Sequence, residues 1–137
     1  MMGAPGATTR VAFYLVPQFS MMAFTSALEP LRMANQLSGQ PLYEWSLVSQ
    51  DGRAVAASNG IELTCDIAAA DVGTGPERPH GLLVCAGVNV HLMADDAADA
   101  LLRRLAPTDT VIGALCTGTW LLARADVLDG YRCTIHW

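Results

Sequence analysis

The sequence is poor in charge, and basic residues are the scarcer kind. Only 15% of its 137 residues are charged, and 8 Lys and Arg stand against 13 Asp and Glu, which gives a net charge of −5. A nucleic-acid surface needs a stripe of positive charge to neutralise phosphates. The densest basic spot is the pair Arg103–Arg104, which is typical of a solvated helix face. We therefore expect that this chain does not bind DNA by itself.

Long apolar runs are absent as well. No stretch approaches the roughly 18 apolar residues of a membrane span, and residues 1–10 lack the apolar core of a signal peptide. We expect no membrane association and a cytoplasmic location. Gly, Pro, Ala and Thr dominate residues 1–10, which favours a disordered tail ahead of a single domain over residues 11–137.

Cysteine is limited to four positions, and none of them forms a CxxC pair or a Cys/His cluster with zinc spacing. We expect no metal site, no cofactor and no disulfide framework, which is typical of a reducing compartment. Cys65, Cys85 and Cys133 have no chemical context, so we expect them to be packing residues. Cys116 stands apart because of its neighbours.

Apolar residues make up 52% of the chain, which fits a sheet that is covered on both faces. Short β-rich runs alternate with helical patterns, and this order predicts a parallel, doubly wound α/β sheet. Pro30, inside the first helix, predicts a kink or a new first turn, and Asn59-Gly60 predicts a hairpin insertion with a type I′ turn. The expected strands are 11–16, 43–49, 55–57, 61–65, 82–85, 110–115 and 131–135, and the expected helices are 20–35, 94–105 and 119–125.

Cys116 lies between an apolar strand and a helix, with Ala114 two residues before it and Gly118 two residues after it. Small residues at these spacings are what a nucleophile elbow needs, because the chain reverses tightly there. Free N–H groups at the start of the helix would favour a thiolate or hold an anion, and ligands of open α/β sheets bind at this edge. The alternative is a buried structural cysteine at a tight junction.

Three further residues are candidates for the same site. His136 follows the last expected strand and would emerge on the edge that carries Cys116, although a histidine there is more often a surface residue. Glu29, on the first helix, could place a carboxyl near the thiol or remain exposed. Gly87 could offer N–H groups like an oxyanion hole or be an ordinary turn glycine. His80 and His91 are interpreted as bystanders.

At these residues the chain resembles the N-terminal domain of the GlxA-like branch of AraC-family transcription regulators. That domain belongs to the ThiJ/PfpI, or class I glutamine-amidotransferase-like, superfamily. The most distinctive stretches are FYLVPQFSMMAFTSALEPLRMANQLSG (13–39) and GALCTGTWLLARADVLDGYRCTIHW (113–137). The resemblance implies a flavodoxin-like fold, usually dimeric, followed in a full-length regulator by a helix-turn-helix pair. That pair is absent from these residues, and the fold is expected to be incomplete at the C-terminal end.

The resemblance also implies the site. It matches Cys116 to the elbow cysteine, Glu29 to the carboxylate that contacts it and His136 to the histidine after the next strand. Thr117, Gly87 and Val88 complete the expected ligand-binding set, although Ala86-Gly87 replaces the Gly-Gly of many relatives. Such regulators sense a small nitrogenous metabolite such as arginine, carnitine or glycine betaine. The alternatives are a cysteine-dependent hydrolase or deglycase, and a dimerisation module with a vestigial pocket.

Overall fold

The structure, a computed structural model, describes residues 6–136 of the chain. The strands are β1 (Thr9–Leu15), β2 (Tyr43–Ser49), β3 (Val55–Ala56), β4 (Glu62–Leu63), β5 (Ile67–Ala68), β6 (Gly81–Cys85) and β7 (Val111–Leu115). The helices are α1 (Met21–Ser38), α2 (Asp96–Leu105) and α3 (Thr119–Arg124), with two 3-10 turns, η1 (Ala69–Asp71) and η2 (Val90–Leu92). Because β1 begins at Thr9, the expected tail over residues 1–10 is two residues too long, and its first five lie outside the described residues.

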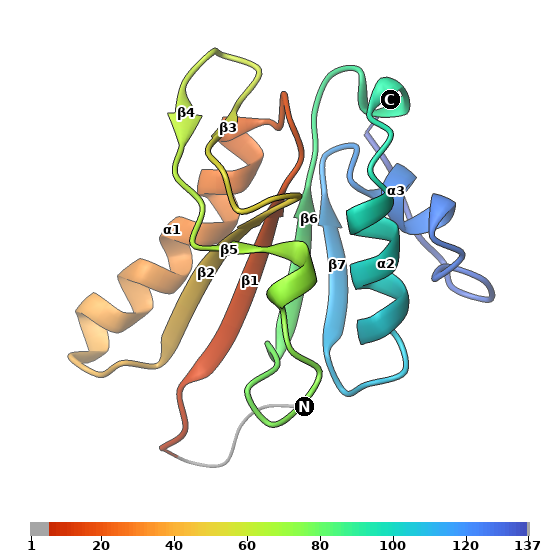
Figure 1. Cartoon of the computed structure of the whole chain (residues 1–137). Helices are drawn as coiled ribbons and strands as arrows, with labels where there is room; N and C mark the ends of the chain where they lie inside the picture. Colours follow the sequence, from red (N-terminus) through yellow and green to blue (C-terminus); the bar gives the residue numbers. More distant parts are fainter. Residues whose placement is uncertain (1–5, 137) are drawn as a thin grey trace.

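Five strands form one parallel sheet in the order β5-β2-β1-β6-β7, which confirms the predicted doubly wound α/β fold. Figure 1 shows α1 on one face of this sheet and α2 with α3 on the other. One face packs around Phe13, Leu15 and Phe24, and the other packs around Tyr14, Val84 and Leu101. Alternate residues of β1 therefore serve opposite layers, as a strand with two covered faces requires.

Two strand predictions differ from the structure. The pairing of β5 with β2 was not predicted, because β5 has only two residues and so short a segment shows no recognisable strand pattern in the sequence. The predicted strand 131–135 is wrong: residues 131–136 are irregular and exposed, and they pair with no described strand. Their backbone is held at isolated points instead, where Thr119 Oγ1 donates to the carbonyl of Thr134 at 2.7 Å.

Helix α1 begins and ends where its sequence signals indicate. The Ser20 side chain caps the first turn by accepting from the N–H of Ala23 at 3.2 Å, and Gly39 ends the helix with a φ of 66°. Pro30 lies on the exposed side, and one helix runs through it from Met21 to Ser38 rather than restarting there. The ring can be tolerated because it points to solvent and one lost hydrogen bond is a local defect.

The β3–β4 hairpin is present, but its turn is not type I′. A type I′ turn requires a positive φ at both central residues, and of the pair only Gly60 has one, at 84°. The N–H of Gly60 donates to Ala57 at 2.9 Å, and the N–H of Ala57 donates to Ile61 at 2.9 Å. This is the pattern of a three-residue loop, a type I turn closed by a left-handed glycine.

A buried polar pair ties β1 to the start of α2. The Tyr14 hydroxyl donates to Asp95 Oδ2 at 2.6 Å, while Asp95 Oδ1 caps α2 by accepting from the N–H of Ala98 at 2.9 Å. Tyr14 and Asp95 are 1% and 3% exposed. Burial, and then the hydrogen bond to the carboxylate, raises the pKa of Tyr14 far above its ordinary value. The carboxylate is thus satisfied at both oxygens inside the core.

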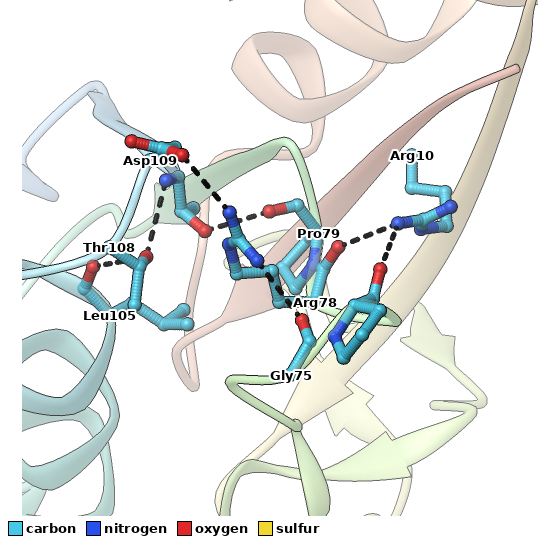
Figure 2. A network of polar contacts seen from close by, with 9 residues as sticks. Arg10, Gly75, Arg78, Pro79, Leu105, Thr108 and Asp109 are labelled. Atoms are coloured by element: carbon cyan, nitrogen blue, oxygen red, sulfur yellow. Dashed lines mark hydrogen bonds and ion pairs between the residues drawn. The ribbon is translucent and has the colours of Figure 1, made fainter. Parts of the chain in front are cut away.

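The amino-terminal edge of the sheet is closed by the loop over residues 72–80. In Figure 2 the Arg10 guanidinium donates to two carbonyls of this loop, and Arg78 reaches Gly75 and Asp109. Thr110 Oγ1 donates to the carbonyl of Pro79 at 2.8 Å. This network lies at the opposite edge from the ends of β1, β6 and β7. Among the described helices, none combines the length and the apolar character needed to span a membrane.

Candidate functional site

Cys116 stands directly after β7, on the turn that leads into α3. Its φ is 57°, in the left-handed region that a side chain seldom occupies. Gly118 makes the turn feasible, because a Cβ at that position would lie 2.3 Å from the carbonyl oxygen of Val84. The N–H of Gly118 donates to Leu115 at 3.0 Å and closes the turn. The predicted strand–turn–helix elbow is therefore confirmed. Gly118 is required in it because the backbone of β6 lies too close for a side chain.

Backbone strain gathers at this edge of the sheet. Gln18 after β1, Asn89 after β6 and Cys116 after β7 all have a positive φ, and the part of the chain that the structure describes holds one other such non-glycine residue, Asp126. Asn89 Nδ2 donates to Gln18 Oε1 at 3.1 Å, which joins two of these turns. Strained backbone persists only where the surroundings over-determine it, and it concentrates at functional sites.

Gly87 locks the loop after β6 against its neighbours. A Cβ at Gly87 would lie 2.3 Å from the carbonyl oxygen of Gln18, so the two backbones could not approach this closely with any other residue. The Gly87 carbonyl accepts a hydrogen bond from Thr117 Oγ1 at 2.6 Å. Gly87 therefore holds the loops after β1, β6 and β7 together.

These loops surround a cavity of about 710 Å³. Its walls come from the first turns of α1 and α3, the hairpin, the loop between β6 and η2, and the segment before Trp137. The lining residues are Ser20, Met22, Ala23, Ser58, Gly87, Val88, Asn89, Val90, His91, Cys116, Thr117, Trp120, Ile135 and His136. The cavity thus lies at the carboxyl ends of β1, β6 and β7, where open α/β sheets bind ligands.

Five of the six expected site residues line this cavity: Cys116, Thr117, Gly87, Val88 and His136. The N–H of His136 donates to the carbonyl of Cys116 at 3.2 Å, so the histidine is held at the elbow by its backbone. It arrives there through an irregular segment and not from the end of a strand. The expected proximity of residues 116 and 136 is present, by a different route than predicted.

Glu29 does not line the cavity. Its carboxylate pairs with Arg32 Nε at 2.9 Å, and both side chains are nearly half exposed. The α1 residue Met22 lines the cavity. Met22 lies seven residues before Glu29, which separates the two by about 10 Å along the helix axis. The expectation that Glu29 contacts the thiol is therefore wrong for this structure, since two helical turns separate it from the wall.

His91 lines the cavity as well, although the sequence had suggested a bystander. Its position in the sequence could have indicated this, because His91 follows the end of β6 by six residues and so belongs to the segment at the carboxyl ends of the strands. His80 is a structural residue: its Nδ1 accepts from the N–H of Arg10 at 2.9 Å, at the opposite edge of the sheet.

The described residues that line the cavity include no carboxylate and no guanidinium. Its titratable side chains are Cys116, His91 and His136, and the large side chains Met22 and Trp120 give it an apolar surface. Among residues 6–136, no group of three or more His, Cys, Asp or Glu is placed to hold a metal ion. The arrangement suits a small ligand with an apolar or aromatic-contacting part.

The other three cysteines lie elsewhere. Cys65 and Cys85 are buried packing residues, as predicted, and burial raises the pKa of both thiols. Cys133 is exposed and lines a separate cavity of about 520 Å³ beside β7, so the expectation that it packs in the core is wrong. Cys116 is partly exposed within its cavity.

A parallel α/β sheet with a cysteine on a strained elbow, above a cavity made by strand-end loops, defines a small class of domains. The DJ-1/PfpI family model matches residues 9–137. The chain therefore belongs to the DJ-1/PfpI family.

Several proteins of similar sequence are transcription regulators. The chain is 42% identical over 127 residues to the HTH-type transcriptional regulator GbdR of Pseudomonas aeruginosa, covering 93% of this chain and 34% of that protein. It is 40% identical over 129 residues to the HTH-type transcriptional regulator GlxA of Rhizobium meliloti, covering 93% and 39%. The crystal structure of an AraC family transcriptional regulator from Pseudomonas putida superimposes with a TM-score of 0.80 at 36% identity, covering 93% of this chain and 66% of that one. The chain thus spans somewhat over a third of the length of these curated relatives.

Proposed function

We propose that this chain is the ligand-sensing and dimerisation domain of a cytoplasmic transcription regulator that responds to a small nitrogenous metabolite, either an amino acid or a quaternary amine. The observation that carries the proposal is the cavity of about 710 Å³ at Cys116, built from the loops at the ligand edge of the sheet. The regulators of similar sequence support it. DNA contact is then the task of a helix-turn-helix domain elsewhere in the full-length protein.

The cavity wall favours a quaternary amine over an amino acid with a cationic side chain. A primary ammonium or a guanidinium carries N–H donors that need acceptors when buried, and the described part of the wall has no carboxylate. A quaternary ammonium has no N–H group to satisfy, and the face of Trp120 can attract it through its ring electrons. His91 on the same wall can donate an N–H to a carboxylate on the same ligand.

The second candidate is a cysteine-dependent hydrolase or deglycase, favoured by the positive φ of Cys116 on an elbow. Such chemistry needs a base or an orienting group next to the thiol. With Glu29 paired to Arg32, that task would fall to His136 or His91. We favour the sensor, because Glu29 lies away from the thiol and no other described residue brings a carboxylate to the wall.

Calorimetric titration of the full-length protein with glycine betaine, carnitine and arginine tests the proposal. We expect binding of a quaternary amine, unchanged in Glu29→Gln and about 2- to 30-fold weaker in Trp120→Leu, the range of a cation–π contact. Proton NMR of the same mixtures must show the ligand intact after hours. Absence of heat with all three compounds would overturn the sensor proposal for these ligands, and steady conversion of a ligand would favour the enzyme.

A further inference from the structure

A second cavity lies at the amino-terminal edge of the sheet, at the far end of β1 from the elbow. Its volume is about 270 Å³, slightly below the roughly 300–1,000 Å³ of pockets for drug-sized ligands. Its floor is the start of β1 and β2, where Arg10 and Glu44 are register neighbours and Ser46 follows on the face that packs against α2. Its outer wall is η1 and the loop over residues 72–80. The size suits a small organic molecule.

The outer wall is held in place by arginines that donate to its backbone. The Arg10 guanidinium donates to the carbonyls of Pro76 and Arg78 (Figure 2), and Arg104 of α2 donates to two carbonyls nearer the start of the wall. The remaining Nε of Arg10 is buried and has no acceptor in the described chain. These guanidinium groups therefore spend their donors on carbonyl groups and leave the carboxylates of the cavity unpaired.

Three carboxylates line this cavity, on Glu44, Asp71 and Glu77. Among residues 6–136, none of these three side chains makes an ion pair or a hydrogen bond. Glu44 stays unpaired although Arg10 is its neighbour in the strand register. One guanidinium against three carboxylates leaves two negative charges in excess on the wall. A concave surface with an excess of one sign attracts a ligand of the other, which here is a cation.

The loop makes room for one of these carboxylates. A Cβ at Gly73 would overlap the Glu77 carboxylate, and a Cβ at Gly75 would lie 2.8 Å from Glu77 Oε2. Two glycines thus leave the space that the Glu77 side chain occupies against the loop. A side chain that is already seated loses less conformational entropy when a ligand binds. Ser46 on the floor adds a hydroxyl that makes no hydrogen bond within the described chain.

We propose that this second cavity binds a small organic cation that carries N–H donors, either a primary amine or an alkylguanidinium. Its carboxylates and its hydroxyl accept the hydrogen bonds that such a cation must make, and hydrogen bonds between charged partners are the strong ones. The described residues hold no group placed to bind a metal ion. The cavity at Cys116 has the opposite character, with no carboxylate among its described lining residues. The domain therefore has separate sites for two kinds of amine.

Calorimetric titration of the full-length protein with 1,4-diaminobutane tests the site, at about 0.15 M salt to screen weak surface attraction. We expect a dissociation constant below about 1 mM and at least roughly tenfold weaker binding of tetramethylammonium, which has no N–H donor. Glu77→Gln keeps the shape of the side chain and removes its charge, and should weaken diaminobutane binding about tenfold or more. Glu62→Gln is the matched control, because Glu62 is an exposed, unpaired carboxylate of β4 that does not line the cavity.

The outcomes separate this site from general attraction to an acidic protein and from the Cys116 cavity. Equal losses in Glu77→Gln and Glu62→Gln, equal binding of the two cations, or no heat with diaminobutane would overturn the proposal. Glu44→Gln, on an exposed strand position, is a second variant that should weaken binding if Glu77→Gln does not fold. Glu77→Gln should leave the binding of a quaternary amine unchanged, and Trp120→Leu should leave the binding of diaminobutane unchanged. Either proposal can therefore fail while the other stands.

Discussion

Removing the Tyr14 hydroxyl isolates one buried interaction with a calculable cost. Tyr14→Phe keeps the ring in the core and leaves Asp95 Oδ2 without its donor at 2.6 Å. Hydrogen bonds to charged groups contribute about 1.5–3 kcal/mol, and a buried acceptor left unpaired loses this amount. We therefore expect the free energy of unfolding at pH 7 to fall by about 1.5–3 kcal/mol, with an unchanged denaturant slope.

The same variant makes a prediction about pH. The pKa of Tyr14 is raised in the folded state, mainly by burial and then by Asp95. Above about pH 10 the tyrosine of the unfolded chain ionises while the folded one stays protonated, so the wild type loses stability through this group, with a slope that approaches about 1.4 kcal/mol per pH unit. Tyr14→Phe lacks that loss. Because the unfolded tyrosine is about half ionised at pH 10, the difference in unfolding free energy between the two proteins must narrow by about 1 kcal/mol between pH 10 and pH 11.

Urea denaturation followed by circular dichroism, at pH 7 and at steps up to pH 11, measures both effects. Tyr43→Phe is the control, because Tyr43 is partly buried and its hydroxyl has no hydrogen-bond partner in the described chain; a change within about 0.5 kcal/mol is expected. Cys65 and Cys85 titrate in both proteins, so their alkaline contributions cancel in the comparison. A loss below about 0.5 kcal/mol in Tyr14→Phe, or a gap independent of pH, would refute the reasoning.

Three further predictions concern the elbow, the opposite edge and the thiols. Gly118→Ala should lower the free energy of unfolding by more than about 3 kcal/mol or prevent folding, because its Cβ would lie 2.3 Å from the Val84 carbonyl oxygen. Gly81→Ala is the control, because the nearest atom to its Cβ is 3.8 Å away, and it should cost under about 1 kcal/mol. Thermal unfolding compares the two variants. Arg10→Met should destabilise the protein by about 1–3 kcal/mol, because two loop carbonyls lose their hydrogen-bond donor. Asp109→Ala breaks only an exposed ion pair and should cost under about 1 kcal/mol. Denaturant midpoints compare the two variants. Folded protein should react with Ellman's reagent at two of its four thiols, Cys116 and Cys133, and four equal rates would contradict the assigned burial.

Much of the fold follows from local signals. Ser20 and Gly39 mark the ends of α1, and the apolar runs around Phe13, Val84 and Ile112 mark β1, β6 and β7. The elbow could be predicted because a tight turn needs small residues on both sides of Cys116. These features depend on neighbours in sequence, so a pattern of residue types carries them.

The parts that the sequence did not predict depend on distant neighbours. A two-residue strand such as β5 exists because β2 offers it an edge. Whether residues 131–136 form a strand depends on what lies beside β7, not on their β-rich composition. The position of the first turn of α1 relative to the sheet decides which of its residues lines the Cys116 cavity. That residue is Met22 and not Glu29. His91 joins the site through the same loop packing.

Ligand protection of thiols shows directly whether the cavity at Cys116 binds the effector, because a second exposed cysteine in the same chain serves as the control. Cys116 lines the proposed ligand cavity, and Cys133 is exposed on a different surface. Iodoacetamide labelling of both, followed by mass spectrometry with and without saturating glycine betaine or carnitine, compares the two rates in one sample. If the cavity binds a quaternary amine, an amine that binds by calorimetry slows the labelling of Cys116 and leaves the labelling of Cys133 unchanged. Equal rates at Cys116 with and without such a bound ligand, or equal protection of both cysteines, would contradict it.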